Sequence, residues 1–370
     1  MKGWSGQDGA TPSIERVVSR GVRVPLNIPL GTSAAEIRSV PLLLVDLHLE
    51  GGVVGRSYQF CYTEAGARAV AAHLDEAVKS VIGQGSSPQR LGALLARRLA
   101  LPGVTGTLRM ALSILDVALW DALAVAAALP LAVMLGGSVR PIPAYDSRGL
   151  GLMAPDRLAQ EAERLLESGL PALKLRLGYP EMAGDLAALR TVRRSIPDSC
   201  AIMVDYNQAL TPAEALLRGR ALEAEGVLWI EEPVRHDDYR ASAALAQALT
   251  TPVQIGENLN GPAAMLEAIR TQACDYLMPD LTRIGGVTGW MQAAGIASAA
   301  GIELSSHLMP EISAHLLAAS PTARWLEYVD WADAVLAEPL VLRDGTALIP
   351  DRPGLGIVWD EGKIGRLDSI

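Results

Sequence analysis

The sequence predicts an α/β protein in which a smaller α+β domain precedes a TIM-like barrel. Eight short apolar runs, separated mostly by segments rich in Ala and Leu, follow one another between residues 140 and 336. Three of these runs end in an acidic residue at equal steps of 26 positions, at Asp205, Glu231 and Glu257. One strand, one helix and their loops fill a step of that size, and eight parallel strands with crossover helices make a barrel.

Residues 1–139 are expected to form the α+β domain, because strand-like segments are followed there by helix-like ones. Residues 40–49 and 53–62 are rich in β-forming side chains, and Gly51-Gly52 between them is typical of a hairpin turn. The segments in which apolar residues recur at helical spacing are 64–82, 88–99 and 107–129.

Residues 140–336 are assigned to the barrel. Residues 337–370 are turn-rich, and we expect them to form a C-terminal segment that packs back on the first domain. The apolar runs that would form the eight barrel strands are 142–146, 173–177, 202–206, 227–230, 253–255, 276–278, 302–304 and 325–328.

Composition and charge exclude several classes of function. The net charge is −9 and no basic run is present, which argues against a nucleic-acid partner. The three cysteines have no metal-type spacing and cannot all pair, so we expect a reducing, cytoplasmic location. Residues 1–12 lack the apolar core of a signal peptide, and the apolar stretch 111–135 contains two Asp and a Pro. A membrane span is therefore not expected.

The carboxylates Asp205, Glu231 and Glu257 are the strongest functional signal. The carboxyl ends of barrel strands form the catalytic face, so these side chains should converge on one point. Converging like charges repel one another unless a cation lies among them, and an all-oxygen set selects a hard cation such as Mg²⁺. A single acid after a strand can equally cap the next helix, but the regular triple is more specific.

Five more side chains on predicted strands are candidates for the chemistry. Asp280 and His307 end adjacent strands, so a carboxylate–imidazole hydrogen bond could orient His307 as a general base. Glu327 lies inside the last strand, where partial desolvation would keep it protonated as a donor to an enolate oxygen; the alternative is an outward-facing acid. Lys174 and Arg176 share one side of a strand, either inside the barrel or as basic residues that snorkel at its edge.

The motifs around these residues resemble the enolase superfamily, and specifically the mandelate racemase subgroup, along nearly the whole chain. The motifs that carry the resemblance are Leu173-Lys174-Leu175-Arg176-Leu177-Gly178-Tyr179-Pro180, Met203-Val204-Asp205-Tyr206-Asn207-Gln208, Trp229-Ile230-Glu231-Glu232-Pro233, Gly256-Glu257-Asn258, Met278-Pro279-Asp280, Ile284-Gly285-Gly286-Val287-Thr288-Gly289-Trp290 and Ser305-Ser306-His307-Leu308.

The resemblance implies a (β/α)7β barrel, which is a modified TIM barrel, under an α+β capping domain. It implies an enediolate intermediate, a small carboxylate substrate and a homo-oligomer, either an octamer or a dimer. The residue roles that it implies are Mg²⁺ binding by Asp205, Glu231 and Glu257, proton transfer on one face by His307 with Asp280, a hydrogen bond from Glu327 to the enediolate, carboxylate binding by Lys174 and Ser147, and a place for Asn207 near the α-hydroxyl.

Arg176 departs from the pattern of the subgroup, because the racemase has Lys-x-Lys here and its second lysine is the base on the opposite face. Arginine side chains in general have a pKa of roughly 12.5–13.8, so a neutral guanidinium is rare at pH 7. His307 would then be the competent base, and Arg176 a weak base or a fixed charge.

Residues that match the substrate pocket of the subgroup are mostly apolar. Residues 30–37 take the place of its mobile lid, and the pocket-matching apolar side chains are Leu30, Ala34, Ile37, Phe60, Tyr62, Leu308 and Val329. Such a lining suits an aryl or alkyl 2-hydroxy acid better than a polyhydroxylated sugar acid. We therefore expect an isomerase that racemises such an acid. The alternative is a hydro-lyase, an acid-sugar dehydratase that forms a 2-keto-3-deoxy acid and tolerates the loss of one base.

Overall fold

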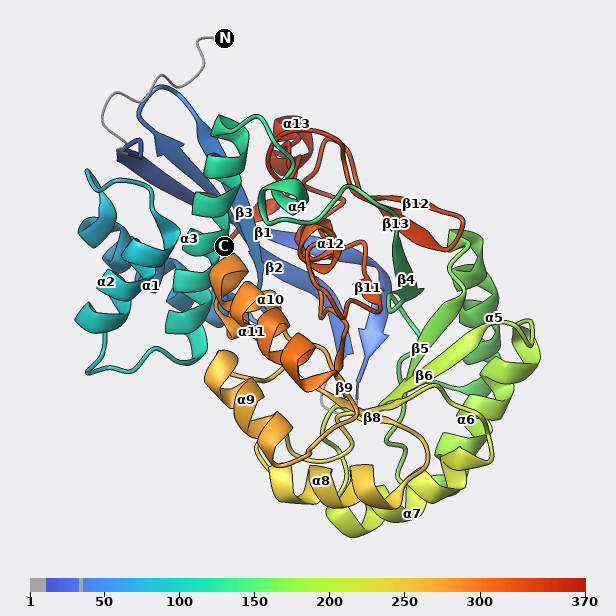
Figure 1. Cartoon of the computed structure of the whole chain (residues 1–370). Coiled ribbons are helices and arrows are strands. Elements are labelled where there is room, and N and C mark those ends of the chain that lie inside the picture. The colour runs from blue at the N-terminus through green and yellow to red at the C-terminus, as the bar shows by residue number, and fades with distance from the viewer. Residues whose placement is uncertain (1–10, 33–35) are drawn as a thin grey trace.

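The computed structural model describes residues 11–32 and 36–370. It contains an antiparallel sheet with its own helices and a barrel of parallel strands, which lie side by side (Figure 1). The predicted fold class, a capped barrel of the α/β type, is therefore confirmed. The expectations for residues 1–10 and for Ala34 fall outside the described residues.

The sheet of the capping domain is antiparallel, in the order β14-β1-β2-β3. The turn between β2 and β3 contains Gly51 and Gly52 with φ of +88° and +83°, a backbone conformation that favours glycine. The predicted hairpin is thus confirmed. The strands of this sheet are β1 (Ile14–Gly31), β2 (Glu36–Leu49), β3 (Val54–Phe60) and β14 (Asp368–Ser369).

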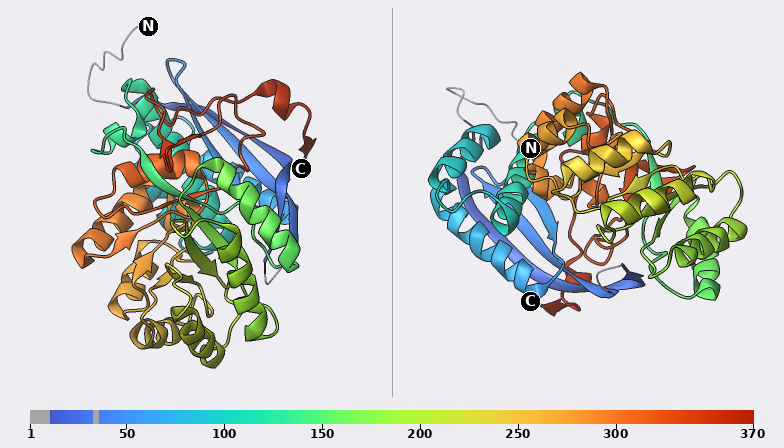
Figure 2. Two further views of the ribbon diagram at one scale, coloured as in Figure 1. Left: turned by 90° about the vertical axis from the view of Figure 1, so that its right-hand side faces the viewer. Right: turned by 90° about the horizontal axis from the view of Figure 1, so that it is seen from below.

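Strand β2 has a buried side chain on both faces of the sheet. Leu42 and Leu44 pack in the core that continues into the barrel, whereas Leu43 and Val45 pack against the helices of the capping domain. This alternation follows from the two-residue period of a strand. One face of the sheet therefore packs against helices of the capping domain and the other against the barrel (Figure 2). These helices are α1 (Glu64–Val81), α2 (Pro88–Arg98) and α3 (Gly106–Ala126).

Eight parallel strands, β4 to β11, form the barrel, and each contains or overlaps one of the predicted apolar runs. Neighbours pair in sequence order from β4 to β10, and β11 pairs with β4. The hydrogen bond from Ser306 N to Trp325 O, at 3.0 Å, joins the chain after β10 to the start of β11. The strands are β4 (Ile142–Asp146), β5 (Ala172–Arg176), β6 (Ala201–Asp205), β7 (Ile230–Glu231), β8 (Val253–Ile255), β9 (Tyr276–Leu277), β10 (Glu303–Leu304) and β11 (Leu326–Tyr328).

Helices follow the first seven barrel strands and surround them, as Figure 1 shows for α5 to α9. After β11 a hairpin comes instead of a helix, which matches the (β/α)7β pattern. The barrel helices are α5 (Pro155–Leu165), α6 (Met182–Ser195), α7 (Pro212–Glu223), α8 (Tyr239–Ala248), α9 (Pro262–Arg270), α10 (Leu281–Ile284), α11 (Gly286–Ala300) and α12 (Pro310–Ala318).

The C-terminal segment contacts both parts of the molecule. The hairpin of β12 (Val341–Arg343) and β13 (Thr346–Leu348) pairs antiparallel with β4 of the barrel. The last strand, β14, pairs with β1 of the capping sheet. Among the described residues, no helix is both long enough and apolar enough to cross a membrane.

Candidate active site

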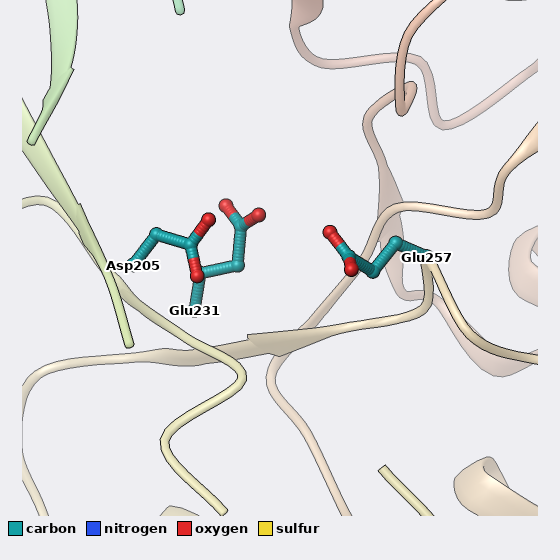
Figure 3. Close-up of side chains that lie close together, drawn as sticks. All are labelled: Asp205, Glu231 and Glu257. Atoms are coloured by element: carbon teal, nitrogen blue, oxygen red, sulfur yellow. The ribbon is translucent and has the colours of Figure 1, made fainter. Parts of the chain in front are cut away.

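Three carboxylates meet at the carboxyl ends of adjacent barrel strands. Asp205 ends β6, Glu231 ends β7, and Glu257 lies two residues after β8. One oxygen of each lies within 4.8 Å of the others, and all three residues are buried. Figure 3 shows the three carboxylates turned toward a common space. The convergence expected from the 26-residue spacing is therefore present.

Lys174 on β5 is the cation closest to this acidic triad. Its Nζ lies 2.8 Å from Glu231 Oε1, 3.4 Å from Asp205 Oδ2 and 2.6 Å from Glu327 Oε1. Burial raises the pKa of Glu231 to about 8; Lys174 opposes this shift and the neighbouring carboxylates add to it. The single ammonium of Lys174 thus contacts three buried carboxylates, so negative charge is in excess around it. A divalent cation that prefers oxygen ligands fits this donor set.

His307 is held between two carboxylates. Its Nδ1 lies 2.9 Å from Asp280 Oδ2, which is the expected carboxylate–imidazole contact, and its Nε2 lies 3.2 Å from Glu257 Oε2. The other oxygen of Asp280 accepts from Thr282 N, Thr282 Oγ1 and Arg283 N at 2.8, 2.7 and 3.0 Å. Asp280 is therefore fixed as the N-cap of α10, and it fixes the imidazole ring in turn.

Burial lowers the pKa of His307, but Glu257, Asp280 and Glu327 raise it more strongly, to about 9. The cause is the concentration of carboxylates around one buried ring. A group that neutralised Glu257 would bring this pKa back toward the range of a general base.

Glu327 on β11 corrects one expectation. Its carboxylate accepts from Ser147 Oγ at 2.7 Å and from Leu308 N at 2.9 Å, besides its contact with Lys174. Burial alone would raise the pKa of Glu327, but Lys174 and His307 lower it to about 2. The prediction of a protonated Glu327 is therefore wrong, because it overlooked the ammonium at contact distance. The alternative of an outward-facing acid is wrong as well, since the side chain is buried within the site.

Arg176 is buried and is held by neutral oxygens. Its Nη1 donates to Ser147 O at 2.9 Å and to Gly149 O at 2.7 Å, and its Nη2 donates to Ser147 Oγ at 2.8 Å. Lys174 and Arg176 therefore both project into the barrel, and the reading as snorkelling residues at a strand edge is excluded. Ser147 lies between Arg176 and Glu327 and contacts both.

Asn207 is fixed beside the triad, in a left-handed conformation with φ of 45°. Its backbone N–H donates to Asp205 Oδ1 at 2.8 Å and its Nδ2 to Asp205 Oδ2 at 3.0 Å. Its Oδ1 is buried and has no hydrogen-bond partner among the described residues. A buried acceptor without a partner is costly, so this oxygen is a natural position for a donor from a ligand.

The apolar pocket-matching residues come from both domains. Leu30 and Phe60 of the capping domain and Leu308 of the barrel are buried, whereas Tyr62 is 49% exposed. Phe60 contacts the rings of Tyr62 and Trp331, with centroids 4.7 and 4.8 Å apart. Ile37 and Val329 pack in the same core as Leu30.

Sequence reasoning assigned no role to three residues near this site. Trp331 lies five residues after the start of β11, and only its contact with Phe60 reveals it. Asn258 and Arg283 interact with each other, and Asn258 also contacts Glu257. Asn258 follows Glu257 directly, and Arg283 lies in the first turn after Asp280, so proximity to a candidate residue was the available signal.

Comparison with known proteins places the chain in a family. Residues 14–136 match the mandelate racemase / muconate lactonizing enzyme N-terminal domain, and residues 157–363 match the enolase C-terminal domain-like family. The chain is 32% identical over 356 residues to the L-talarate/galactarate dehydratase of Salmonella typhimurium, an alignment that covers 95% of this chain and 86% of that protein.

Two solved structures are similar over nearly their full length. An enolase from alpha proteobacterium BAL199 with bound Mg is 40% identical, with a TM-score of 0.95 over 97% of this chain and 100% of that one. An enolase from Bradyrhizobium in complex with magnesium and mandelic acid is 38% identical, with a TM-score of 0.93 over 98% and 99%. The chain belongs to the mandelate racemase/muconate lactonizing enzyme family of the enolase superfamily.

Proposed function

We propose that this protein is a Mg²⁺-dependent enzyme in which His307 removes the α-proton of a 2-hydroxy carboxylate. Asp205, Glu231 and Glu257 would hold the metal, and similar structures with bound magnesium support this assignment. When bound, Mg²⁺ would stabilise the negative charge that develops as the substrate becomes an enediolate. The observation that carries the proposal is the imidazole of His307, which Asp280 orients and which lies 3.2 Å from Glu257.

The remaining polar side chains would bind the substrate. Lys174 and the hydroxyl of Ser147 would contact its carboxylate, and Glu327 would position both as an ionised acceptor. Asn207 Oδ1, which has no partner among the described residues, would accept from the α-hydroxyl. This arrangement distinguishes a 2-hydroxy acid from an acid without the hydroxyl, because the latter would leave a buried acceptor unpaired.

The favoured outcome is racemisation of an aryl or alkyl 2-hydroxy acid. The buried Leu30, Phe60 and Leu308 would contact an apolar substituent at the α-carbon, and mandelic acid in the similar Bradyrhizobium structure is an acid of this class. Arg176 or water would have to return the proton on the face opposite His307. Because neither is a ready proton donor, this step would limit the rate.

A second candidate is dehydration of an acid sugar, and the surroundings of Arg176 favour it. Neutral oxygens hold its guanidinium, so nothing there assists loss of a proton. Dehydration needs His307 alone: it takes the α-proton, gives a proton to the departing β-hydroxyl, and the resulting enol becomes a 2-keto acid. The relation to an L-talarate/galactarate dehydratase supports this candidate.

Proton NMR in D₂O with Mg²⁺ tests the proposal. Each enantiomer of mandelate and of alkyl 2-hydroxy acids, and a set of sugar acids, would be incubated with the protein. Deuterium at the α-carbon of both enantiomers with loss of optical activity supports racemisation, and a 2-keto-3-deoxy acid from a sugar acid supports dehydration. If no substrate exchanges or eliminates, the proposed enolisation is wrong.

A further inference from the structure

A half-buried arginine contacts the loop that carries Glu257 of the acidic triad. Arg283 is in α10, and its guanidinium donates to Oδ1 of Asn258, the residue that follows Glu257. The same guanidinium lies over the ring of Tyr62, 5.9 Å from its centroid. Arg283 thus connects the capping domain to the loop that carries Glu257.

The amide of Asn258 has its nitrogen turned toward two carboxylates. Nδ2 lies 3.0 and 2.8 Å from the two oxygens of Glu232 and 3.1 Å from Oε1 of Glu257. Glu232 is itself buried next to Glu231. An amide has one donor end and one acceptor end, so the reversed orientation would place Oδ1 against the carboxylates and repel them.

The guanidinium favours the same orientation of the amide from the other side. Arginine has five N–H donors and no acceptor, so Arg283 can bind the oxygen of Asn258 but not its nitrogen. With Oδ1 held on the side of Arg283, Nδ2 must face Glu232 and Glu257. The orientation of one amide therefore links a cation in α10 to a carboxylate of the triad.

We propose that Arg283 is a positioning residue for the metal site. By holding Oδ1 of Asn258, it keeps Nδ2 on Glu257 and so keeps that carboxylate turned toward Asp205 and Glu231. This inference rests on the proposed function, since it requires that the triad bind a divalent cation. Substitution of a residue that orients a metal ligand typically lowers metal affinity by about 10- to 100-fold.

The charge of Arg283 alone would have the opposite effect. A positive charge near a cation site repels the cation, so its removal would strengthen binding if charge were its only influence. Positioning predicts weaker binding after the same removal. The sign of the change in affinity therefore separates the two explanations.

The test is the affinity of the full-length protein for Mn²⁺, followed by electron paramagnetic resonance. Arg283→Met should weaken Mn²⁺ binding by about 10-fold or more, and Arg283→Lys, which still donates, should recover part of that loss. Asn258→Ala should weaken binding as well. The double variant should bind no more weakly than Asn258→Ala alone, because Arg283 acts through Asn258.

Arg324→Met is the matched control. Arg324 lies over the ring of Tyr276 at 3.9 Å and pairs with Glu303, but these residues lie at the opposite, amino-terminal ends of the barrel strands. Like Arg283→Met, this variant loses an arginine that lies over an aromatic ring and makes one further side-chain contact. It should bind Mn²⁺ as the wild type does.

Unchanged or tighter binding by Arg283→Met overturns the inference while leaving the metal site intact, and so does an additive loss in the double variant. Wild-type protein that binds no Mn²⁺ overturns the proposed function and this inference together. If Arg283→Met fails to fold, the Mn²⁺ affinities of Arg283→Lys and Asn258→Ala test the inference instead. Full wild-type affinity in Asn258→Ala overturns it.

Discussion

The two ring nitrogens of His307 contact different carboxylates: Nδ1 lies 2.9 Å from Asp280 Oδ2, and Nε2 lies 3.2 Å from Glu257 Oε2. The ring therefore spans the distance between the N-cap of α10 and the acidic triad. It cannot rotate without losing both contacts. In the proposed function, a base fixed in this way would act on one face of a substrate bound at the triad.

Replacing His307 with Asn should reduce exchange of the substrate α-proton by about 10²- to 10⁴-fold, because the positioned proton acceptor is lost. Binding of Mn²⁺ should change by much less, since the three carboxylates remain. Deuterium incorporation measured by NMR gives the first quantity. His73→Asn in α1 is the control and should exchange at the wild-type rate; equal rates in His307→Asn and wild type would contradict the assignment.

Arg176→Lys should increase exchange from the face opposite His307 by about 10-fold or more, because a lysine ammonium releases its proton more readily than a guanidinium. The measurement is the initial rate of deuterium incorporation into each enantiomer separately. The rate for the enantiomer that His307 deprotonates should change little. If neither rate rises, Arg176 is adapted to a reaction that needs a fixed cation at this position.

Lys174→Met should lower the free energy of unfolding by about 3–5 kcal/mol in the presence of a chelator, because three buried carboxylates lose their ammonium. Added Mg²⁺ should recover more stability in this variant than in the wild type, since the cation replaces the missing charge. Urea unfolding with and without Mg²⁺ measures both effects. Lys79→Met, which breaks only an exposed pair with Glu76, should change the free energy of unfolding far less.

His315 should make the fold sensitive to acid. It is fully buried in α12, where Nδ1 accepts from Ala132 N at 3.2 Å, and burial lowers its pKa to about 4. Between pH 6.5 and 4 this imidazole binds a proton in the unfolded chain but stays neutral in the native protein. The stability present above pH 6.5 is therefore lost as pH falls. The expected loss is about 3 kcal/mol. Urea unfolding at several pH values should show a shallower decline in His315→Gln, and an equal decline would contradict this role.

Glu311 should make the fold less stable as the pH rises toward 7. Burial raises its pKa to about 7, although the hydroxyl of Tyr58 donates to it and opposes the shift. The native state therefore holds a proton that the unfolded chain releases above pH 4.5, and the stability present below that pH is lost as pH rises to 7. In Glu311→Gln the loss of stability between low and high pH should be smaller by about 3 kcal/mol. The melting temperature at pH 5 and pH 8 measures it: if the gap between the two pH values stays as wide as in wild type, Glu311 is not its cause.

Periodicity along the chain was enough to predict the barrel and the acidic triad. Each apolar run between residues 140 and 336 contains or overlaps a strand, because a parallel strand that is buried on both faces is mostly apolar. Asp205, Glu231 and Glu257 follow from the same regularity, since equivalent positions of successive units lie at one end of the barrel. His307 and Asp280 could be found for the same reason.

Interactions between distant residues were decided only by the tertiary structure. The pKa of Glu327 is lowered because Lys174, 153 positions earlier in the chain (327 − 174), lies 2.6 Å away, and no local pattern encodes that distance. The orientation of Asn258 depends in the same way on Arg283. The order of the barrel strands and the residues at their carboxyl ends could be predicted from the chain alone. Packing determined their charge states and orientations, because a pKa and a hydrogen bond depend on neighbours in space and not on neighbours in the chain.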